Sequence, residues 1–193
     1  MPFEISDDLS PEVYPLAWLV GSWRGQGVVN YPGVDEAVFV NDVTFDHDGG
    51  PYLRYESTIR ILDEQPTPAD PAVGLWPDAE ASVDDDVPST VWSTETGYWR
   101  VSSERPEGLP ENRFPVEVIV ADAAGRASLF LGTVGQGRIE LATDFVARTT
   151  TATEVTASQR MYGFVEGDLL WHEELAAFGN ELQPYASARL AQK

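Results

Sequence analysis

The chain has 193 residues, of which 42% are hydrophobic, 11% aromatic and 23% charged, a composition typical of one compact domain with its own core. Acidic residues number 32 against 12 Lys and Arg, giving a formal net charge of −20; such a surface repels phosphate backbones and anionic lipids, so we expect neither nucleic acid nor membrane as a partner. The absence of cysteine excludes disulfides, thiolate metal sites and cysteine nucleophiles, and it fits a reducing cytoplasm.

The first residues predict neither an exported nor a membrane-spanning protein. Acidic residues stand at Glu4, Asp7 and Asp8, where a secretory signal carries basic ones, and no apolar stretch of signal length follows. The apolar run 16–20 is five residues long, whereas a membrane helix needs about 20. We therefore expect a soluble, cytoplasmic protein.

Residues 10–20 predict one short helix. Ser10 suits the N-cap, Pro11 the first helical position and Glu12 the first turn, while Pro15 keeps the helix short. The apolar residues at helical spacing are Val13, Leu16, Ala17 and Val20. This apolar face indicates a lid or plug over one end of a larger structure.

A glycine-rich motif follows the predicted helix. Gly21, Gly25 and Gly27 surround Trp23 at the start of the first predicted strand. The spacing differs from that of nucleotide-binding glycine loops, and neither a lysine nor a helix follows. Glycines at this position allow a neighbouring backbone to approach closely, and Trp23 can fill the bottom of a closed sheet.

The rest of the chain alternates apolar and polar residues in short segments separated by Gly, Pro, Asn or Asp. In the segment 138–145, for example, Ile139, Leu141 and Phe145 are expected to share one face. Ten strands are predicted, at 23–31, 36–45, 51–62, 90–102, 114–121, 126–134, 137–147, 153–165, 168–178 and 184–190. Turn sequences such as 48–51 and 166–168 favour successive antiparallel hairpins.

Ten antiparallel strands without a long helix must either stack as two sheets or close on themselves. Closure removes exposed sheet edges, so we predict an all-β fold, an up-and-down barrel of about ten strands in one domain over 1–193. A barrel of this strand number is wider than its own side chains can fill. A ligand cavity is therefore expected.

One segment, 63–90, interrupts the strand pattern. It contains five prolines and eight acidic residues but no Lys or Arg, which predicts a mobile, solvated insertion. The alternative is an acidic docking arm or a cation site around Asp84, Asp85 and Asp86. These residues lack the spaced ligands and the fixed glycine of a calcium loop.

The two histidines are weak candidates for chemistry. His47 lies at a predicted hairpin tip, where a solvated turn residue is favoured over a metal ligand. His172 alternates with Trp171 and Glu173 and so lies on the opposite face of its strand; we favour a wall or surface histidine over a catalytic one. Because the chain also lacks a nucleophile-elbow motif, a hydrolase is disfavoured.

The motif Gly-x-Trp-x-Gly-x-Gly after a short apolar helix resembles the signature of the nitrobindin family, within the fatty-acid-binding-protein-like barrels. Other stretches resemble the same family in the same order: 93–100, 139–141, 154–157, 160–163, 167–170 and 179–184. The resemblance implies a ten-stranded antiparallel barrel that holds a ferric b-type haem at one end. It also implies nitric oxide binding and isomerisation of peroxynitrite to nitrate.

The resemblance further implies an iron-binding histidine after a Leu-Gln-Pro motif, and here the residue after Leu182-Gln183-Pro184 is Tyr185. A neutral imidazole binds iron readily, whereas a phenol must first lose a proton with a pKa of about 10. Tyrosinate does ligate ferric haem in catalases, and a nearby cation would stabilise it. Arg189 shares strand parity with Tyr185 but lies about 13 Å along an extended strand.

Two more positions depart from the pattern that the resemblance implies. Gly33 stands in Tyr-Pro-Gly-Val where the family commonly has Tyr-Pro-Thr-Ile on the haem side, so a hydroxyl is lost. Glu173 shares strand parity with Trp171 and Leu175 and stands where the family usually has an aliphatic pocket residue. A carboxylate buried there needs a partner; the alternative is that Glu173 faces solvent.

Three functional hypotheses follow. The favoured one is a nitrobindin-like barrel without histidine-ligated haem, not an enzyme, that binds another small apolar ligand or none and needs no cofactor. Its candidate ligand-binding residues are Tyr185, Gly33, Glu173, Trp171 and Leu175. The alternative is a haem b protein with Tyr185 as axial ligand that isomerises peroxynitrite or binds nitric oxide. The third is an interaction protein whose insertion at 63–90 docks a basic partner.

Overall fold

The computed structural model describes residues 8–65 and 86–193. One 3₁₀ helix, η1 (Pro11–Leu19), precedes ten strands. The strands are β1 (Gly21–Tyr31), β2 (Val34–Asp46), β3 (Leu53–Leu62), β4 (Ser89–Val101), β5 (Phe114–Asp122), β6 (Arg126–Gly135), β7 (Arg138–Arg148), β8 (Val155–Val165), β9 (Asp168–Ala177) and β10 (Gln183–Gln192). The ends of the predicted strands differ from these by at most two residues.

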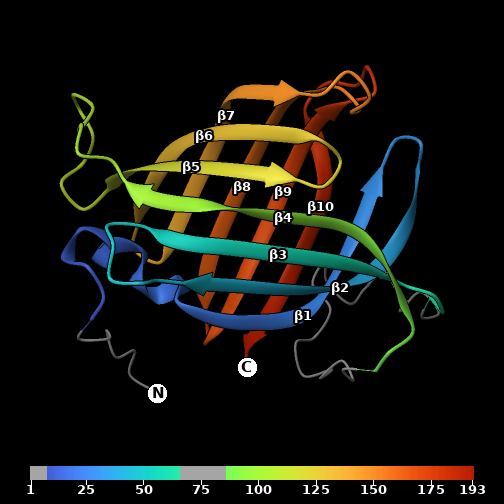
Figure 1. The fold of residues 1–193 in the computed structure, drawn as a ribbon, viewed down its shortest axis with the longest axis horizontal. Helices are drawn as coiled ribbons and strands as arrows, with labels where there is room; N and C mark the ends of the chain where they lie inside the picture. The colour runs from blue at the N-terminus through green and yellow to red at the C-terminus, as the bar shows by residue number, and fades with distance from the viewer. Residues whose placement is uncertain (1–7, 66–85) are drawn as a thin grey trace.

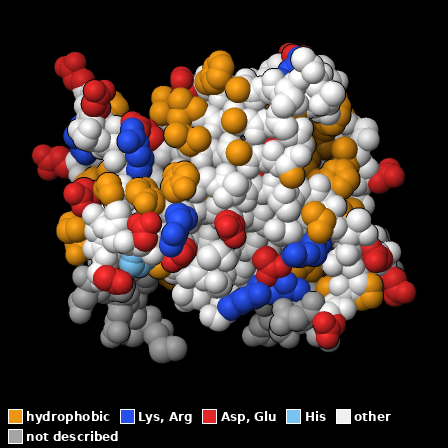
Figure 2. All heavy atoms as spheres, viewed as in Figure 1, with side chains coloured by type: hydrophobic (Ala, Val, Ile, Leu, Met, Phe, Trp, Pro, Cys, Tyr) orange, Lys and Arg blue, Asp and Glu red, His pale blue; other side chains and the backbone are white. Residues whose placement is uncertain are grey.

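The ten strands form one closed antiparallel barrel (Figure 1). Each strand pairs with its neighbour in the sequence, and β1 pairs with β10 to complete the ring. The predicted all-β, up-and-down barrel is therefore confirmed. Figure 2 shows acidic, basic and apolar side chains interspersed over one face of the barrel.

The glycine motif lies where β1 meets β10. A Cβ atom on Gly25 would lie 2.1 Å from the carbonyl oxygen of Arg189, and one on Gly27 would lie 2.3 Å from that of Ser187. Any side chain at these positions would push the two strands apart. The motif is thus explained by the close backbone approach that closes the barrel.

The helix and Trp23 plug one end of the barrel. Val13, Leu16 and Leu19 are fully buried, and Trp23 is 1% exposed. The indole Nε1 of Trp23 donates a hydrogen bond to the carbonyl oxygen of Leu19 at 2.8 Å, so the plug is fastened to the first strand. Farther in, Trp99 packs edge-on against Phe45. The expected lid is present at this end, which we call the closed end.

The helix itself differs from the expected one in two details. It is a 3₁₀ helix that ends at Leu19, and Ser10 makes no side-chain cap to the backbone; its hydroxyl donates to the Glu12 carboxylate instead. Pro11 and Pro15 both lack a backbone N–H, which weakens the hydrogen-bond ladder of so short a helix. Val20 therefore lies beyond the helix, half-buried against the core.

A bulge between Leu129 and Phe130 changes the facing of β7. Phe130 pairs with Thr143 and Leu129 with Phe145, so Asp144 is the extra residue. Phe145 consequently points out of the barrel and is 62% exposed. The expectation that it shares the inner face of Ile139 is wrong, because one inserted residue reverses the parity.

The pairing of β7 with β8 is shorter than that of β7 with β6. The β7–β8 ladder runs only from the pair Arg138–Gly163 to the pair Ala142–Gln159, whereas β7 pairs with β6 along its whole length. Beyond Ala142, the amide of Ser158 donates instead to the Thr143 hydroxyl at 3.0 Å. The last part of β7 is therefore paired on one side only within the described structure.

The predicted insertion at 63–90 lies between β3 and β4. Its described flanks are joined where the Asp63 amide donates to the Pro88 carbonyl oxygen at 3.0 Å. Residues 66–85 lie outside the described part of the chain. They make up most of the predicted insertion and include Asp84 and Asp85. Among the described residues, no helix has the length and apolarity to cross a membrane.

Candidate functional site

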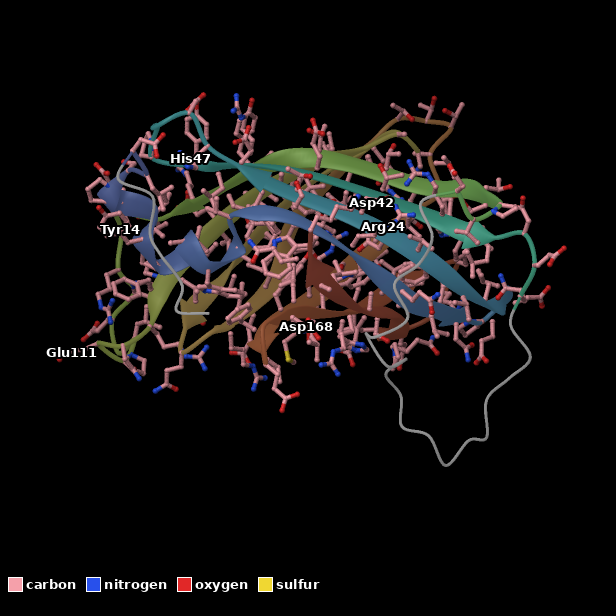
Figure 3. The ribbon with its side chains drawn as sticks, turned by 90° about the horizontal axis from the view of Figure 1, so that it is seen from below. Tyr14, Arg24, Asp42, His47, Glu111 and Asp168 are labelled. Atoms are coloured by element: carbon pink, nitrogen blue, oxygen red, sulfur yellow. The ribbon has the colours of Figure 1, made fainter. Side chains whose placement is uncertain are left out.

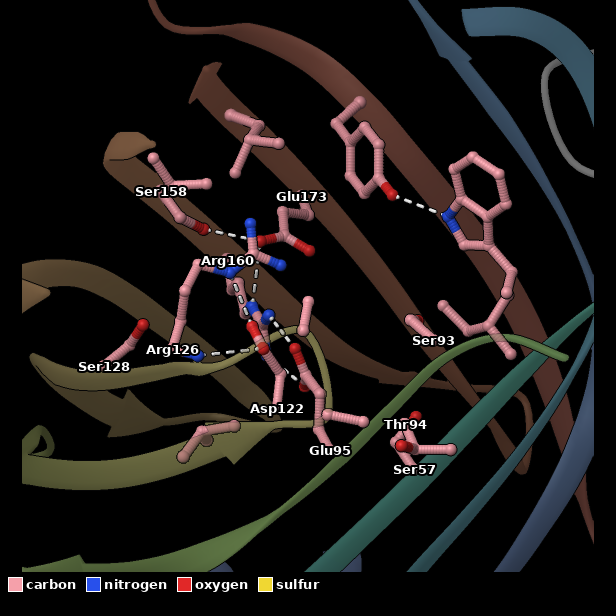
Figure 4. A pocket seen from close by; sticks show the side chains of 18 of the residues that line it. Ser57, Ser93, Thr94, Glu95, Asp122, Arg126, Ser128, Ser158, Arg160 and Glu173 are labelled. Carbon is pink, nitrogen blue, oxygen red and sulfur yellow. Dashed lines mark hydrogen bonds and ion pairs between the residues drawn. The ribbon is translucent and has the colours of Figure 1, made fainter. Parts of the chain in front are cut away.

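A cavity of about 470 Å³ occupies the barrel at the end away from η1. Val34 at the start of β2, Trp92 near the start of β4 and Tyr185 near the start of β10 line its mouth. These strand ends lie opposite the start of β1, which the helix covers. We call this the open end; Figure 4 shows its inner wall.

Tyr185 lies in the wall of the cavity mouth. A bulge between Pro184 and Ala186 interrupts the β9–β10 ladder, so Tyr185 turns inward although Ala186 next to it is also buried. Its hydroxyl oxygen accepts a hydrogen bond from Nε1 of Trp92 at 2.9 Å. Arg189 instead pairs with Asp168 at 2.6 Å on the outer face, so the expected shared parity of Tyr185 and Arg189 is wrong, and the bulge is the reason.

The surroundings of Tyr185 favour its neutral phenol. Burial raises the pKa of Tyr185 above its ordinary value, and the hydrogen bond from Trp92 lowers that pKa by less. The negative charge of Glu173 raises the pKa further. The phenol is therefore protonated at neutral pH.

Three charged side chains form a buried cluster deeper in the cavity. Arg160 on β8 binds Glu95 on β4 with two hydrogen bonds, from Nη1 at 2.8 Å and from Nη2 at 2.6 Å. Its Nε lies 3.2 Å from Oε1 of Glu173 on β9. The hydroxyl of Ser158 donates to the same oxygen at 2.6 Å, and that of Tyr55 donates to Glu95 at 3.2 Å. The cluster joins opposite walls of the barrel.

Two members of this cluster, Glu95 and Arg160, are held in the charged form. Burial raises the pKa of Glu95, but the charge and hydrogen bonds of Arg160 outweigh burial and leave that pKa below its usual value. Burial lowers the pKa of Arg160, but Glu173 and Glu95 together raise it well above the ordinary value. One permanent guanidinium is thus shared between two carboxylates.

The structure places Glu173 inside the barrel together with Trp171 and Leu175, all three in the cavity wall. Glu173 is 8% exposed, so the alternative of a solvent-facing Glu173 does not hold. Trp171 donates from Nε1 to the side-chain oxygen of Asn41 at 2.9 Å, and Asn41 is fully buried. This second polar contact fixes the indole beside the charged cluster.

Gly33 does not line the cavity, contrary to expectation. It lies in the β1–β2 turn with φ of +84°, and no described atom comes within 4 Å of where its Cβ would be. Its neighbour Val34 lines the cavity instead. The tight turn carries Gly33 out beyond the mouth, where an added hydroxyl would face solvent.

Neither histidine belongs to the cavity. Figure 3 shows His47 at the same end of the barrel as Tyr14 of η1, the closed end. His172 lies between Trp171 and Glu173 on β9, and since those two line the cavity, His172 faces outward. In the described part of the chain, no three His, Asp or Glu side chains are grouped as a metal site.

Glu95, Arg160 and Asn41 are not among the site residues predicted from the sequence. Strand parity contained a signal for two of them, because Glu95 shares strand parity with the buried Trp99 and Arg160 with the buried Tyr162. Charged residues on an apolar face were the feature to look for. No local pattern pairs residues 65 positions apart.

Comparison with known proteins gives concordant results. A family model described as "THAP4-like, heme-binding beta-barrel domain" matches residues 12–192. A Beutenbergia cavernae protein named "Ferric nitrobindin-like protein" is 45% identical over 99% of both chains. A "Peroxynitrite isomerase" of Leifsonia xyli is 38% identical, covering 97% of this chain and 98% of its own. The crystal structure of Rv2717c from M. tuberculosis superposes with a TM-score of 0.70 at 26% identity, covering 96% of this chain and 99% of that one.

Proposed function

The chain belongs to the nitrobindin family of haem-binding β-barrel domains, and from that premise we propose that it is a ligand-binding protein whose cavity holds a small, partly apolar molecule instead of a histidine-ligated haem. The observation that carries this proposal is the set of donor groups in the cavity. Among the described lining residues, the groups able to ligate iron are three phenols and three carboxylates, and none is a histidine: Tyr55, Tyr162, Tyr185, Glu95, Asp122 and Glu173.

These donors do not fit ferric haem as they stand. Burial raises the pKa of Tyr55, Tyr162 and Tyr185 and keeps all three phenols protonated, and a neutral phenol is a poor ligand for iron. Glu95 and Glu173 are engaged by Arg160, and Asp122 is engaged by Arg126 at 2.6 Å. Each candidate ligand would have to give up a proton or an ion pair before it could bind a metal.

The same cavity suits a small organic molecule. Its volume of about 470 Å³ lies within the range of about 300–1,000 Å³ that is usual for ligand pockets. Val34, Ile59 and Leu175 give it apolar walls, and the charged cluster gives it a few fixed polar groups. This combination of apolar wall and oriented polar groups is what binding of a small ligand requires.

The alternative function is a haem protein with Tyr185 as axial ligand. One observation favours it: the phenolic oxygen of Tyr185 lies in the cavity wall and accepts a hydrogen bond from Trp92, and such a bond stabilises a phenolate. The relative from Leifsonia xyli is named a peroxynitrite isomerase. We rank this function second because burial of Tyr185 outweighs the hydrogen bond.

A titration with ferric haemin, followed by visible absorption, separates the two functions. We expect no saturable one-to-one spectrum from the wild-type protein and none from Tyr185→Phe, but a saturable spectrum from Tyr185→His, since imidazole is a ready iron ligand. A stoichiometric spectrum in the wild type that Tyr185→Phe abolishes would establish the haem alternative.

A second titration tests the cavity itself with the uncharged fluorescent probe N-phenyl-1-naphthylamine. We expect saturable binding to the wild type and its loss in Leu175→Trp, because the larger ring fills the space next to Tyr185 and Glu173. The matched control is Leu131→Trp, which adds the same ring at a site on β6 that is 45% exposed. Equal binding by both variants would mean that the probe binds elsewhere and would overturn the proposed site.

A further inference from the structure

Resting on the proposed function, and specifying its ligand, we infer that the cavity takes a small amphiphilic cation, an alkyl or arylalkyl ammonium, with the ammonium group on Glu173 and the apolar part toward the mouth. The observations that carry this inference are the charge of the cavity, one carboxylate oxygen without a partner in the described part of the chain, and the apolar rim.

The lining of the cavity carries an excess of one negative charge. Asp122 and Arg126 form a pair at 2.6 Å near the β5–β6 turn and compensate each other. Deeper in the cavity, Arg160 is the one described residue that forms an ion pair with Glu95 and with Glu173. The formal charge of the described lining is therefore −1, and a low-dielectric enclosure makes that charge act more strongly than it would on the surface.

The unbalanced charge faces the cavity at Glu173. Both contacts of this side chain, from Ser158 at 2.6 Å and from Arg160 at 3.2 Å, are made by Oε1. Its Oε2 has no hydrogen-bond partner among the described residues. This oxygen is not fully buried, so it stays accessible from the cavity. Figure 4 shows this second oxygen pointing away from Ser158, into the open part of the cavity. It is an acceptor placed where a ligand can reach it.

Two aromatic side chains share the cavity wall with Glu173. Trp171 and Tyr185 line the cavity with it, and the faces of such rings attract cations. The rim is apolar and open to solvent: Val91 is 57%, Trp92 47% and Phe178 63% exposed. The backbone of Phe178 on the rim has a φ of +54°, a conformation that is costly for a bulky residue. An apolar tail would cover this rim while the charged head lies below it.

An anionic head group meets the opposite conditions. Both arginines of the described lining already have carboxylate partners. Arg126 is paired with Asp122 at 2.6 Å. Arg160 donates from Nη1 and Nη2 to Glu95, and its Nε lies 3.2 Å from Glu173 in an ion pair without hydrogen-bond geometry. A carboxylate in the cavity would add a second uncompensated negative charge. The overall charge of −20 likewise favours approach of cations over anions.

The test compares three probes of equal chain length by calorimetric titration at pH 7: n-octylamine, octan-1-ol and octanoate. An alkylamine resembles the lysine side chain, with a pKa of about 10.4, and is protonated at this pH. We expect octylamine to bind about tenfold or more tightly than octanol, since a charge-assisted hydrogen bond is added, and octanoate to bind weakest. In Glu173→Gln the advantage of the amine over the alcohol should disappear, while octanol affinity is retained.

The matched control is Glu117→Gln, which changes net charge equally but lies on the outer face of β5, paired with Arg100 at 2.5 Å; it should leave all three affinities unchanged. Octanol or octanoate binding as tightly as the amine in the wild type, a comparison that needs no variant, would overturn the inference. So would an amine preference that survives in folded Glu173→Gln. Failure of all three probes and of the fluorescent probe would instead overturn the proposed function itself.

Discussion

The two ends of the barrel solve the same packing problem in opposite ways. Ten strands enclose more space than their own side chains fill. At the closed end, η1 and Trp23 fill this space with apolar groups, and Trp99 is fully buried. At the open end, the space is left hollow and crossed by the Arg160 ion cluster. Stability therefore resides mainly at one end and the capacity for recognition at the other.

The two ends also contribute differently to the free energy of unfolding. Burying large apolar side chains stabilises the closed end by about 2–3 kcal/mol for each. A buried ion cluster contributes little net stability, because desolvation offsets its attraction, yet it is expensive to break. The open end is thus maintained at little net benefit to folding, as expected for a binding site.

The strongest test of this division is Trp23→Ala at the closed end. The free energy of unfolding should fall by about 4 kcal/mol, the usual loss for removing a buried tryptophan, as measured by urea denaturation. Affinity for N-phenyl-1-naphthylamine should be unchanged in conditions where the variant is folded. A folded variant that no longer binds the probe would show that the two ends are not independent.

A slightly smaller loss is expected from Arg160→Met at the open end. The substitution leaves Glu95 and Glu173 buried without their cation, which should cost about 3 kcal/mol in urea denaturation. Adding Glu95→Gln should recover part of that loss. Arg100→Met, which breaks an exposed pair with Glu117, should cost less than about 1 kcal/mol; an equal loss from both single variants would contradict a special role for the cluster.

An intermediate effect is expected from alkali, through Tyr162, whose ring packs edge-on against Trp99 of the closed end and also lines the cavity. Burial raises the pKa of Tyr162 to about 12, against about 10 in the unfolded chain. Its contribution is full below pH 10 and is lost as the pH rises from about 10 toward about 12, on the order of 2–3 kcal/mol. Unfolding measured across this range should show that loss in the wild type and in Tyr14→Phe, and less of it in Tyr162→Phe.

The smallest effect is expected at the rim, from Trp92→Phe. This change removes the hydrogen bond to Tyr185 between two partly exposed side chains, so the free energy of unfolding should fall by about 1 kcal/mol or less. Since that bond lowers the pKa of Tyr185, its loss should raise this pKa, and the absorbance of tyrosinate in a titration to alkaline pH can follow the change. A lowered pKa would contradict the placement of the indole.

Sequence patterns predicted the closed end better than the open one. Strand periodicity, turn residues and the glycines at 25 and 27 depend on neighbours along the chain or on the general geometry of barrels, so the strands and the plug followed from them. The ion cluster joins Glu95 to Arg160 across the interior, and only the register of the whole barrel determines that contact. Single-residue bulges turn Phe145 outward and Tyr185 inward. Each extra residue reverses the alternation of side chains along its strand, and the position of a bulge cannot be predicted from the sequence alone.

The short ladder between β7 and β8 gives the barrel a line of weakness. Opening the barrel there breaks fewer backbone hydrogen bonds than opening it along the longer β6–β7 ladder. We therefore expect amide protons beside this seam to exchange with solvent through local opening and not through global unfolding. Val155 and Ser158 lie along the seam and also line the cavity. Local opening of this seam would therefore admit water through the side of the barrel, beside Ser158 and the Glu173 carboxylate to which it donates, without passing the rim at Trp92.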